Sequence, residues 1–287
     1  MTIGKQPCDD GVIRSQPARS PCAPRSQPWV LAATILGSSM AMIDSTVVNV
    51  ALPALQSALN ASTAQVQWVV EAYALFLAAL TLVGGSLGDR YGRKRIFAAG
   101  VFLFALASLW CGVSPDVNHL IAARAVQGVG GALLVPGSLA IISAAFDESQ
   151  RGQAIGTWSG FTAITSAVGP VLGGWLVENT SWRWIFFLNL PLAAIVLLLV
   201  FLHVPESRGE ERGRLDWAGA TLATIGLGAI VFGLIEAGQK GLEHWEVLSA
   251  IALGTIALLA FLWLEARSRT PMMPLSLFRS STFSGAN

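Results

Sequence analysis

Apolar residues in this chain come in long blocks and not in the short periodic stripes of surface helices. Eight blocks are long enough to cross a bilayer as helices, for which about 20 residues are needed. They cover residues 29–52, 66–87, 96–113, 120–146, 154–177, 184–204, 217–235 and 247–264. A barrel strand would need only about 9–11 residues with strict alternation. The pattern therefore predicts an all-α polytopic membrane protein.

The composition fits a membrane protein. Charged residues make up 12% of the 287 residues, whereas soluble domains usually contain about 25%. Cys8, Cys22 and Cys111 fall in the amino-terminal tail and in one span, so neither a disulfide framework nor a metal site is expected. Residues 1–28 are rich in Pro, Ser and Arg, and they are predicted to form a disordered cytoplasmic tail and not a cleaved signal peptide.

The positions of Lys and Arg predict the orientation of the chain. The connections on one side carry only Arg183 and Lys240. The connections on the other side carry Lys5, Arg14, Arg19, Arg25, Arg90, Arg93, Lys94, Arg95, Arg151, Arg208, Arg212, Arg214, Arg267, Arg269 and Arg279. The positive-inside rule then places the amino terminus in the cytoplasm. We expect a multi-pass protein of a plasma membrane, here a bacterial inner membrane.

The segment from Gly85 to Arg95 reads Gly-Ser-Leu-Gly-Asp-Arg-Tyr-Gly-Arg-Lys-Arg and lies between two predicted spans. A soluble turn does not need so many cations, and an ordinary membrane loop does not need Asp89. The pattern predicts a short, strongly basic hairpin at the membrane surface, and this hairpin is the strongest indication of function in the chain.

Asp44 is the leading functional candidate inside a span. It lies about two thirds of the way along the first span, among Ser38, Ser39, Ser45, Thr46 and Asn49. A charge at the bilayer centre costs about 2.5–3.5 kcal/mol on insertion scales, and desolvation favours the neutral form of a carboxyl group. The position therefore predicts a proton carrier. The alternative is a structural Asp that is satisfied by hydrogen bonds between helices.

The fourth span carries a polar and glycine-rich face that begins at Arg124. Gln127, Gly128 and Gly131 follow at offsets of three, four and seven residues, on the same side of a helix. Arg124 is predicted to face the bundle interior and to meet a carboxylate or carbonyl groups. The alternative is an Arg that snorkels to the outer interface. For Glu71, near the outer end of the second span, a proton-coupling role and a simple interfacial position are equally compatible with the sequence.

Small residues recur every three or four positions in the fifth span, which favours close approach of another helix. They are Gly152, Gly156, Gly160, Ala163, Ala167, Pro170 and Gly174. Within this small-residue stripe, residues 169–174 read Gly-Pro-Val-Leu-Gly-Gly, and the proline is expected to remove a backbone hydrogen bond and kink the helix. The stripe by itself indicates packing, and the Gly-Pro cluster is its specific part.

Taken in order, these segments resemble the major facilitator superfamily, and specifically its fourteen-helix drug:proton antiporter branch. The resembling segments are residues 42–53 (first-helix signature), 85–94 (motif between helices two and three), 120–131 (fourth-helix motif), 169–174 (fifth-helix motif of exporters), 215–219 and 234–238 (two additional central helices) and 271–278 (linker to the second half). The motif residues carried over are Gly85, Asp89, Arg90, Gly92, Arg93 and Lys94; Gln127, Gly128 and Gly131; and Gly169, Pro170, Gly173 and Gly174.

The resemblance also implies a domain organisation. The expected parts are a six-helix transporter bundle at residues 29–204, a cytoplasmic linker at 205–216, two additional helices at 217–264, and a linker with the start of a ninth helix at 265–287. The second six-helix bundle of the family is missing, so we expect a fragment or truncated product. In the family, two bundles rock around a central cavity, and the resemblance implies that Asp89 helps to lock one conformation against the second bundle.

The resemblance implies proton-coupled export of amphipathic or cationic small molecules such as drugs, with Asp44, Arg124 and Glu71 as proton-coupling residues. The expected partners are a small-molecule substrate, protons and membrane lipid. A periplasmic adaptor stays an open possibility. The alternatives are transport of a specific metabolite, or a non-transporting remnant or interaction protein.

An enzyme is not expected. His119, His203 and His244 lack metal-ligand spacing, and the sequence contains neither a phosphate-cradling loop nor a nucleophile and base pair. No cofactor or metal is therefore expected. Because nearly all the cations of the connections lie at one membrane face, nucleic acid is not an expected partner.

Overall fold

The computed structural model describes residues 26–209 and 217–267. Predictions for residues 1–25, 210–216 and 268–287 lie outside the described residues. These predictions concern most of the tail, part of the first linker and most of the final segment. Within the described residues, eight helical segments are long and apolar enough to cross a membrane. All eight predicted spans are thus confirmed as membrane-length helices.

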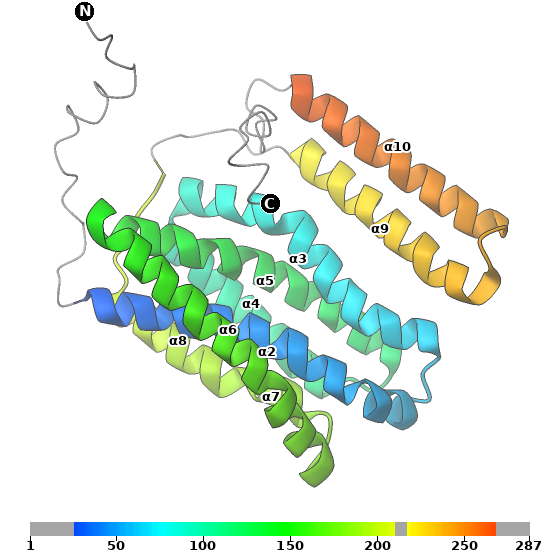
Figure 1. Ribbon diagram of the computed structural model, residues 1–287, viewed down its shortest axis with the longest axis horizontal. Helices are drawn as coiled ribbons and strands as arrows, with labels where there is room; N and C mark the ends of the chain where they lie inside the picture. Colours follow the sequence, from blue (N-terminus) through cyan, green and yellow to red (C-terminus); the bar gives the residue numbers. More distant parts are fainter. Residues whose placement is uncertain (1–25, 210–216, 268–287) are drawn as a thin grey trace, which may run out of the picture.

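Nine helices follow one another along the described residues (Figure 1). They are α2 (Gln27–Leu59), α3 (Thr63–Tyr91), α4 (Arg93–Gly112), α5 (Val117–Ala145), α6 (Glu148–Asn179), α7 (Trp184–Phe187), α8 (Asn189–His203), α9 (Trp217–Lys240) and α10 (Trp245–Arg267). Most helices extend past their predicted spans, because polar residues can continue a helix beyond the hydrocarbon without an apolar signal. The sixth predicted span is divided into α7 and α8 at Leu188, and together these two still cover Trp184–His203.

Side-chain caps define where α3 and α5 begin. Ser62 and Gln65 form a reciprocal capping box, in which the Gln65 backbone N–H donates to Ser62 Oγ at 3.3 Å and the Ser62 N–H donates to Gln65 Oε1 at 2.9 Å. Asp116 Oδ1 accepts from the backbone N–H groups of Asn118 and His119 at 2.9 and 3.0 Å. Hydrogen bonds from His119 hold the pKa of Asp116 below its usual value. The bond from the His119 backbone contributes most, and the bond from the His119 ring is the second cause.

The centre of the bundle is α5, which packs between α3 and α4. Glycines allow the backbones to approach closely. A Cβ atom on Gly100 of α4 would lie 2.8 Å from the Leu134 backbone nitrogen, and one on Gly130 of α5 would lie 2.7 Å from the Phe104 backbone nitrogen. On the other side of the bundle, α2 contacts α5, α6 and α8.

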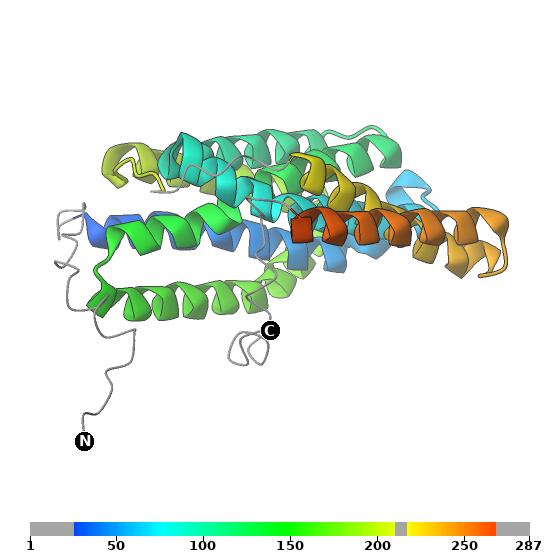
Figure 2. The ribbon, with the colours of Figure 1, turned by 90° about the horizontal axis from the view of Figure 1, so that it is seen from above.

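The last two helices form a hairpin beside the bundle (Figures 1 and 2). α9 contacts α3, and α10 packs along α9. The contact with the bundle includes Trp68 of α3 and Phe232 of α9, whose ring centroids are 6.3 Å apart. The described residues therefore form a bundle, α2 to α8, with an attached pair of helices.

The basic segment forms a tight turn between two helices, and most of its charged residues are helical. α3 continues through Asp89 and Arg90 to Tyr91, and α4 begins at Arg93. The turn consists of Gly92 alone, with φ of 115° and ψ of 125°. The predicted turn is thus present but shorter than the gap of residues 88–95 between the two predicted spans, because charged residues outside the hydrocarbon can remain helical. The motif is the end of one helix and the start of the next.

Replacing Gly92 by Ala is expected to lower the free energy of unfolding by about 1–3 kcal/mol, the usual cost of forcing a side chain into such a backbone region. The added Cβ would also lie 2.6 Å from Glu206 Oε1. The measurement is the thermal unfolding midpoint in detergent. Gly238→Ala is the matched control, because that glycine has ordinary φ and no atom within 4 Å of an added Cβ. Equal midpoints for the two variants would contradict the assigned turn.

The glycines of the Gly-Pro cluster pack α6 against α2. A Cβ on Gly173 would lie 3.0 Å from Val47 Cγ1, and one on Gly169 would lie 3.1 Å from Thr46 Cβ. α6 runs through Pro170 without interruption. This part of the sequence therefore does permit close helix approach, as predicted.

The remainder of the small-residue stripe does not pack as the sequence suggests. No atom of the described residues lies within 4 Å of a Cβ placed on Gly152, Gly156 or Gly160. Ala163, Ala167 and Pro170 are exposed. The prediction of one continuous packing face was therefore wrong for the described residues, since residue spacing identifies small side chains on a helix but not the helix that covers them.

Candidate functional site

Asp44 and Arg124 meet in the interior of the bundle. Arg124 Nη1 of α5 donates a hydrogen bond to Asp44 Oδ2 of α2, and the two residues form an ion pair. Each residue is only 1% exposed. Burial of a charged pair requires close geometry and satisfaction of the remaining donors and lone pairs. The predictions that Arg124 faces the interior and meets a carboxylate are confirmed.

Arg124 makes further contacts with α3 and α5. Its Nε donates to the carbonyl oxygen of Val69 at 3.0 Å, and Nη1 donates to Gln127 Oε1 at 2.7 Å. The guanidinium carbon lies 4.3 Å from the ring centroid of Tyr73, a geometry that gives a cation–π contact. Helices α3 and α5 thus hold the cation in a fixed position beside the carboxylate of α2.

Two amide side chains complete the shell around the carboxylate. Gln127 Nε2 donates to Asp44 Oδ1 at 2.8 Å, and Asn189 Nδ2 of α8 donates to the same oxygen at 2.9 Å. Both amides also donate to Ser108 Oγ of α4, at 2.8 and 3.2 Å. We call these five residues, Asp44, Ser108, Arg124, Gln127 and Asn189, the Asp44 cluster. It joins α2, α4, α5 and α8 through polar contacts in an apolar bundle.

Sequence reasoning found three members of the Asp44 cluster and missed two. Ser108 and Asn189 carry no charge, and they were not among the candidates. The available signal was the position of Asn189 within an otherwise apolar span, two residues before Pro191. Glu71 does not join the cluster: it is partly exposed on α3 and makes none of the hydrogen bonds that hold Asp44.

The glycines of the fourth-helix motif bring α5 close to α3. A Cβ on Gly128 would lie 2.5 Å from the Tyr73 carbonyl oxygen, and one on Gly131 would lie 3.1 Å from Leu77 Cδ1. Gly128 is therefore part of the packing that positions Tyr73 and Arg124. The residues that sequence analysis placed on one helix face serve both packing and polar contacts.

A second set of charged residues lies where α3 meets α4. Arg93 Nε donates to Asp89 Oδ1 at 2.8 Å, and Arg93 Nη1 donates to the Ala140 carbonyl at 3.3 Å. Glu206, just after α8, accepts from the Lys94 backbone N–H at 3.1 Å and lies 3.5 Å from Arg95 Nε.

The chain after α8 is attached to the same charged residues by its backbone. The Arg93 N–H donates to the Ser207 carbonyl at 2.9 Å, and the Gly209 N–H donates to the Asp89 carbonyl at 3.0 Å. The basic motif is thus held against the segment that follows the bundle. Sequence analysis did not anticipate this role for residues 206–209.

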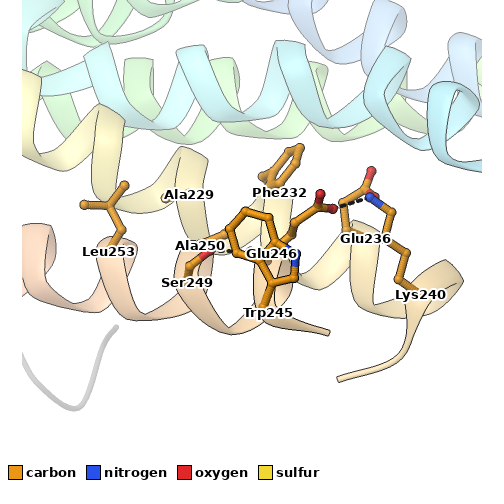
Figure 3. Close-up of a pocket in the computed structure, with 9 residues that line it drawn as sticks. All are labelled: Ala229, Phe232, Glu236, Lys240, Trp245, Glu246, Ser249, Ala250 and Leu253. Atoms are coloured by element: carbon orange, nitrogen blue, oxygen red, sulfur yellow. Dashed lines mark hydrogen bonds and ion pairs between the residues drawn. The ribbon is translucent and has the colours of Figure 1, made fainter. Parts of the chain in front are cut away.

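A separate hollow lies between α9 and α10 (Figure 3). Its volume is about 790 Å³, and its walls include Phe232 and Trp245. Lys240 Nζ lies 3.0 Å from Glu236 Oε2 and 2.5 Å from Glu246 Oε2. Hydrogen bonds to the two carboxylates raise the pKa of Lys240 above its usual value, with the bond to Glu246 contributing most and the bond to Glu236 second. Glu236 belongs to the resembling segment 234–238, but the hollow contains none of the predicted proton-coupling residues, so it is not the predicted site.

The hydrogen bonds of the Asp44 cluster converge on one acidic side chain. Asp44 accepts hydrogen bonds from one cation and two neutral amides, a set that stabilises the charged carboxylate. A second state, with a proton on Asp44, would weaken its attraction to Arg124. Ionisable residues inside a membrane segment are functional candidates by default, and here the carboxylate lies at the contact of four helices.

Comparison with protein families gives a match to the family described as Major Facilitator Superfamily over residues 34–285. Multidrug resistance protein Stp of Mycobacterium tuberculosis is 40% identical over 260 residues, which cover 90% of this chain and 48% of that protein. The tetracenomycin C resistance and export protein of Streptomyces glaucescens is 38% identical over 258 residues, which cover 89% of this chain and 48% of that protein. The chain spans about half the length of these curated relatives.

Solved structures also resemble this chain. A peptide transporter POT in complex with sulfate matches with a TM-score of 0.62 over 86% of this chain and 53% of that chain, at 14% sequence identity. A bacterial homologue of the human lysosomal transporter Spinster matches with a TM-score of 0.51 over 90% of this chain and 64% of that chain, at 21% identity. At these identities the matches show a common fold.

Proposed function

Because the chain belongs to the Major Facilitator Superfamily of membrane transporters, we propose that it takes part in export of amphipathic or cationic small molecules in exchange for protons. Asp44 is the proton carrier in this proposal. The observation that carries it is the buried carboxylate held by Arg124, Gln127 and Asn189 from two other helices. A proton that binds Asp44 would remove the negative charge that attracts Arg124. Such a link between a proton and an ion pair is the elementary step that proton coupling needs.

The proposed class of substrate rests on the relatives. One is named for multidrug resistance and another for tetracenomycin C resistance and export. Both align with about nine tenths of this chain. Residues 169–174, which resemble the fifth-helix motif of exporters, support the direction of transport. The substrate would cross without any chemical change.

The proposed orientation places the amino terminus and the basic motif in the cytoplasm. Arg93, Lys94 and Arg95 gather at one end of the bundle. Arg183 lies at the opposite end, after α6, where it donates to the carbonyl groups of Gly112 and Ser114. The excess of cations at the first end supports this orientation under the positive-inside rule.

The basic motif is proposed to control conformation. Gly85, Asp89, Arg90, Gly92, Arg93 and Lys94 form the junction of α3 and α4. Residues 206–209 bind this junction through Glu206 and backbone groups. Movement of the chain after α8 would therefore change the hydrogen bonds of Asp89 and Arg93. Glu71 is retained as a secondary proton-coupling candidate on the strength of its position in α3.

Transport in everted membrane vesicles tests the proposal. An imposed proton gradient is expected to drive accumulation of ethidium, a lipophilic cation, in vesicles that contain the protein. Asp44→Asn should abolish this accumulation at unchanged protein level, since the neutral amide cannot release a proton. Asp116→Asn is the matched control, because the Asp116 side chain is half exposed outside the Asp44 cluster. Gradient-driven accumulation that persists in Asp44→Asn would remove Asp44 from the mechanism.

A further inference from the structure

Asn189 occupies an unusual place in the Asp44 cluster. It begins α8, is fully buried, and its Nδ2 group donates both to Asp44 Oδ1 at 2.9 Å and to Ser108 Oγ at 3.2 Å. The carbonyl oxygen of the same amide, Oδ1, is buried and has no hydrogen-bond partner among the described residues. A buried acceptor without a donor is unfavourable, because it has lost its hydrogen bonds to water and gained none in return. The cluster thus contains one acceptor that lacks a donor.

A proton on Asp44 would supply a new donor at the same position. An ionised carboxylate only accepts hydrogen bonds, whereas a protonated carboxyl group has one O–H that must find an acceptor. Asp44 Oδ2 faces the guanidinium of Arg124, which offers no acceptor. Asp44 Oδ1 faces the amide of Asn189. If that amide turned by half a rotation, its unpartnered oxygen would face the carboxyl group.

Gln127 cannot perform the same exchange. Its Oε1 already accepts from Arg124 Nη1 at 2.7 Å, and its Nε2 donates to Ser108 as well as to Asp44. A rotated Gln127 would point its N–H groups at the guanidinium and lose that bond. Of the two amides around Asp44, Asn189 is therefore the one that can rotate without giving up a hydrogen bond to its oxygen.

Few other charges bear on this exchange. Among the residues that the structure describes, the titratable or charged groups that interact with Asp44 are Arg124 from α5, Tyr73 from α3 and Cys111 from α4. Tyr73 OH donates to the Ala41 carbonyl at 3.5 Å, and Cys111 Sγ lies 3.7 Å from Gln127 Oε1. From α8, the contact with Asp44 comes from Asn189, a neutral group.

We propose that Asn189 is a positioning residue for proton loading: it donates a hydrogen bond to Asp44 while the carboxyl group is charged, and it accepts one, with its amide rotated, when Asp44 carries a proton. This rests on the proposed function of Asp44 as a proton carrier. Both states of the carboxyl group would then have a hydrogen-bond partner at the same position. The rotation needs no movement of the helix backbone, since an amide has nearly the same shape in both orientations.

Infrared spectroscopy of the lipid-reconstituted protein tests this directly. On acidification, a carbonyl stretching band of a protonated carboxyl group is expected that is absent in Asp44→Asn. In Asn189→Leu, which is similar in size but can neither donate nor accept, this band should move to higher wavenumber because the acid O–H has lost its acceptor. Asn189→Ser should restore the band toward its original position, since a hydroxyl group can both donate and accept. Asn49→Leu is the matched control, because Asn49 is exposed on the same helix as Asp44.

A second measurement uses the unmodified protein and does not depend on whether Asn189→Leu folds. With asparagine labelled at the side-chain carbonyl carbon, acidification should shift one amide band to lower wavenumber as Asn189 Oδ1 gains a donor. The shift should be absent in Asp44→Asn. An Asp44 band that is unaffected in Asn189→Leu, or no amide shift in the unmodified protein, would overturn the role of Asn189 alone. Absence of any Asp44 band over the pH range in which the protein stays folded would overturn both this role and proton carriage by Asp44.

Discussion

Replacing Arg124 by Gln is expected to lower the free energy of unfolding by about 3–5 kcal/mol, the usual cost of removing one partner of a buried ion pair. The variant leaves the carboxylate of Asp44 without its cation and the Val69 carbonyl without its donor. Both groups lie inside the bundle, where water cannot replace the lost bonds. The thermal unfolding midpoint of the purified protein in detergent measures the effect.

A double variant separates the cost of the unpaired charge from loss of packing. Asp44→Asn combined with Arg124→Gln is expected to be more stable than Arg124→Gln alone, because the remaining amides are neutral and can bond to one another. Arg183→Gln is the matched control: Arg183 is partly buried and binds two carbonyl groups, and among the described residues it forms no ion pair with a carboxylate. Its expected loss is about 1 kcal/mol. Equal losses for Arg124→Gln and Arg183→Gln would show that the ion pair is not a special contributor to the fold.

Replacing Gly84 by Ala is expected to destabilise the bundle by about 1–3 kcal/mol, as in other overpacked interiors. The added Cβ would overlap the Ala132 carbonyl oxygen, lie 2.8 Å from the Ala132 carbonyl carbon and 3.2 Å from Leu133 Cα. All three atoms belong to the backbone of α5, so no side chain can rotate to make room. The helices α3 and α5 would have to separate, and the contacts of Arg124 with Val69 and Tyr73 across this interface would weaken.

Gly156→Ala, also a glycine-to-alanine replacement, is expected not to destabilise the bundle. Gly156 lies within α6, and no atom of the described residues is within 4 Å of its added Cβ. Ala is favoured over Gly in a helix by about 1 kcal/mol, so this variant should be as stable as the parent or more so. Unfolding midpoints of the two variants, measured together, decide the matter. A loss in Gly156→Ala as large as that in Gly84→Ala would mean that α6 is covered on this face.

Much of the architecture follows from local properties of the sequence. Each span is a block of apolar residues long enough to satisfy its own backbone in lipid, so the number and type of the helices can be predicted without knowledge of their packing. The exact ends cannot, as the helical residues Asp89 and Arg90 show. Charged residues continue a helix outside the hydrocarbon with no apolar pattern to mark them. Gly92 then ends α3 by its backbone conformation.

The candidate residues could be identified one by one, but their arrangement could not. Asp44 and Arg124 attract attention because charges are costly inside a membrane. They lie 80 residues apart in the sequence. Asn189, which is 145 residues from Asp44, is neutral and so gives no comparable signal. Glu71 has the charge but lies outside the cluster, because its side of α3 does not face Asp44.

What the sequence by itself determined is the membrane class, the eight spans, the family resemblance and the cost of placing Asp44 and Arg124 in lipid. These properties depend on composition, block length and short motifs, all of which are local. Only the tertiary structure decided which polar groups meet: Arg124 pairs with Asp44, and Gln127 and Asn189 bind the same carboxylate oxygen. It also decided where α6 packs on α2, which is at Gly169 and Gly173 but not at Gly156. The physical reason is that residue spacing defines the face of a helix, whereas the neighbour of that face is selected by the close packing of all helices together.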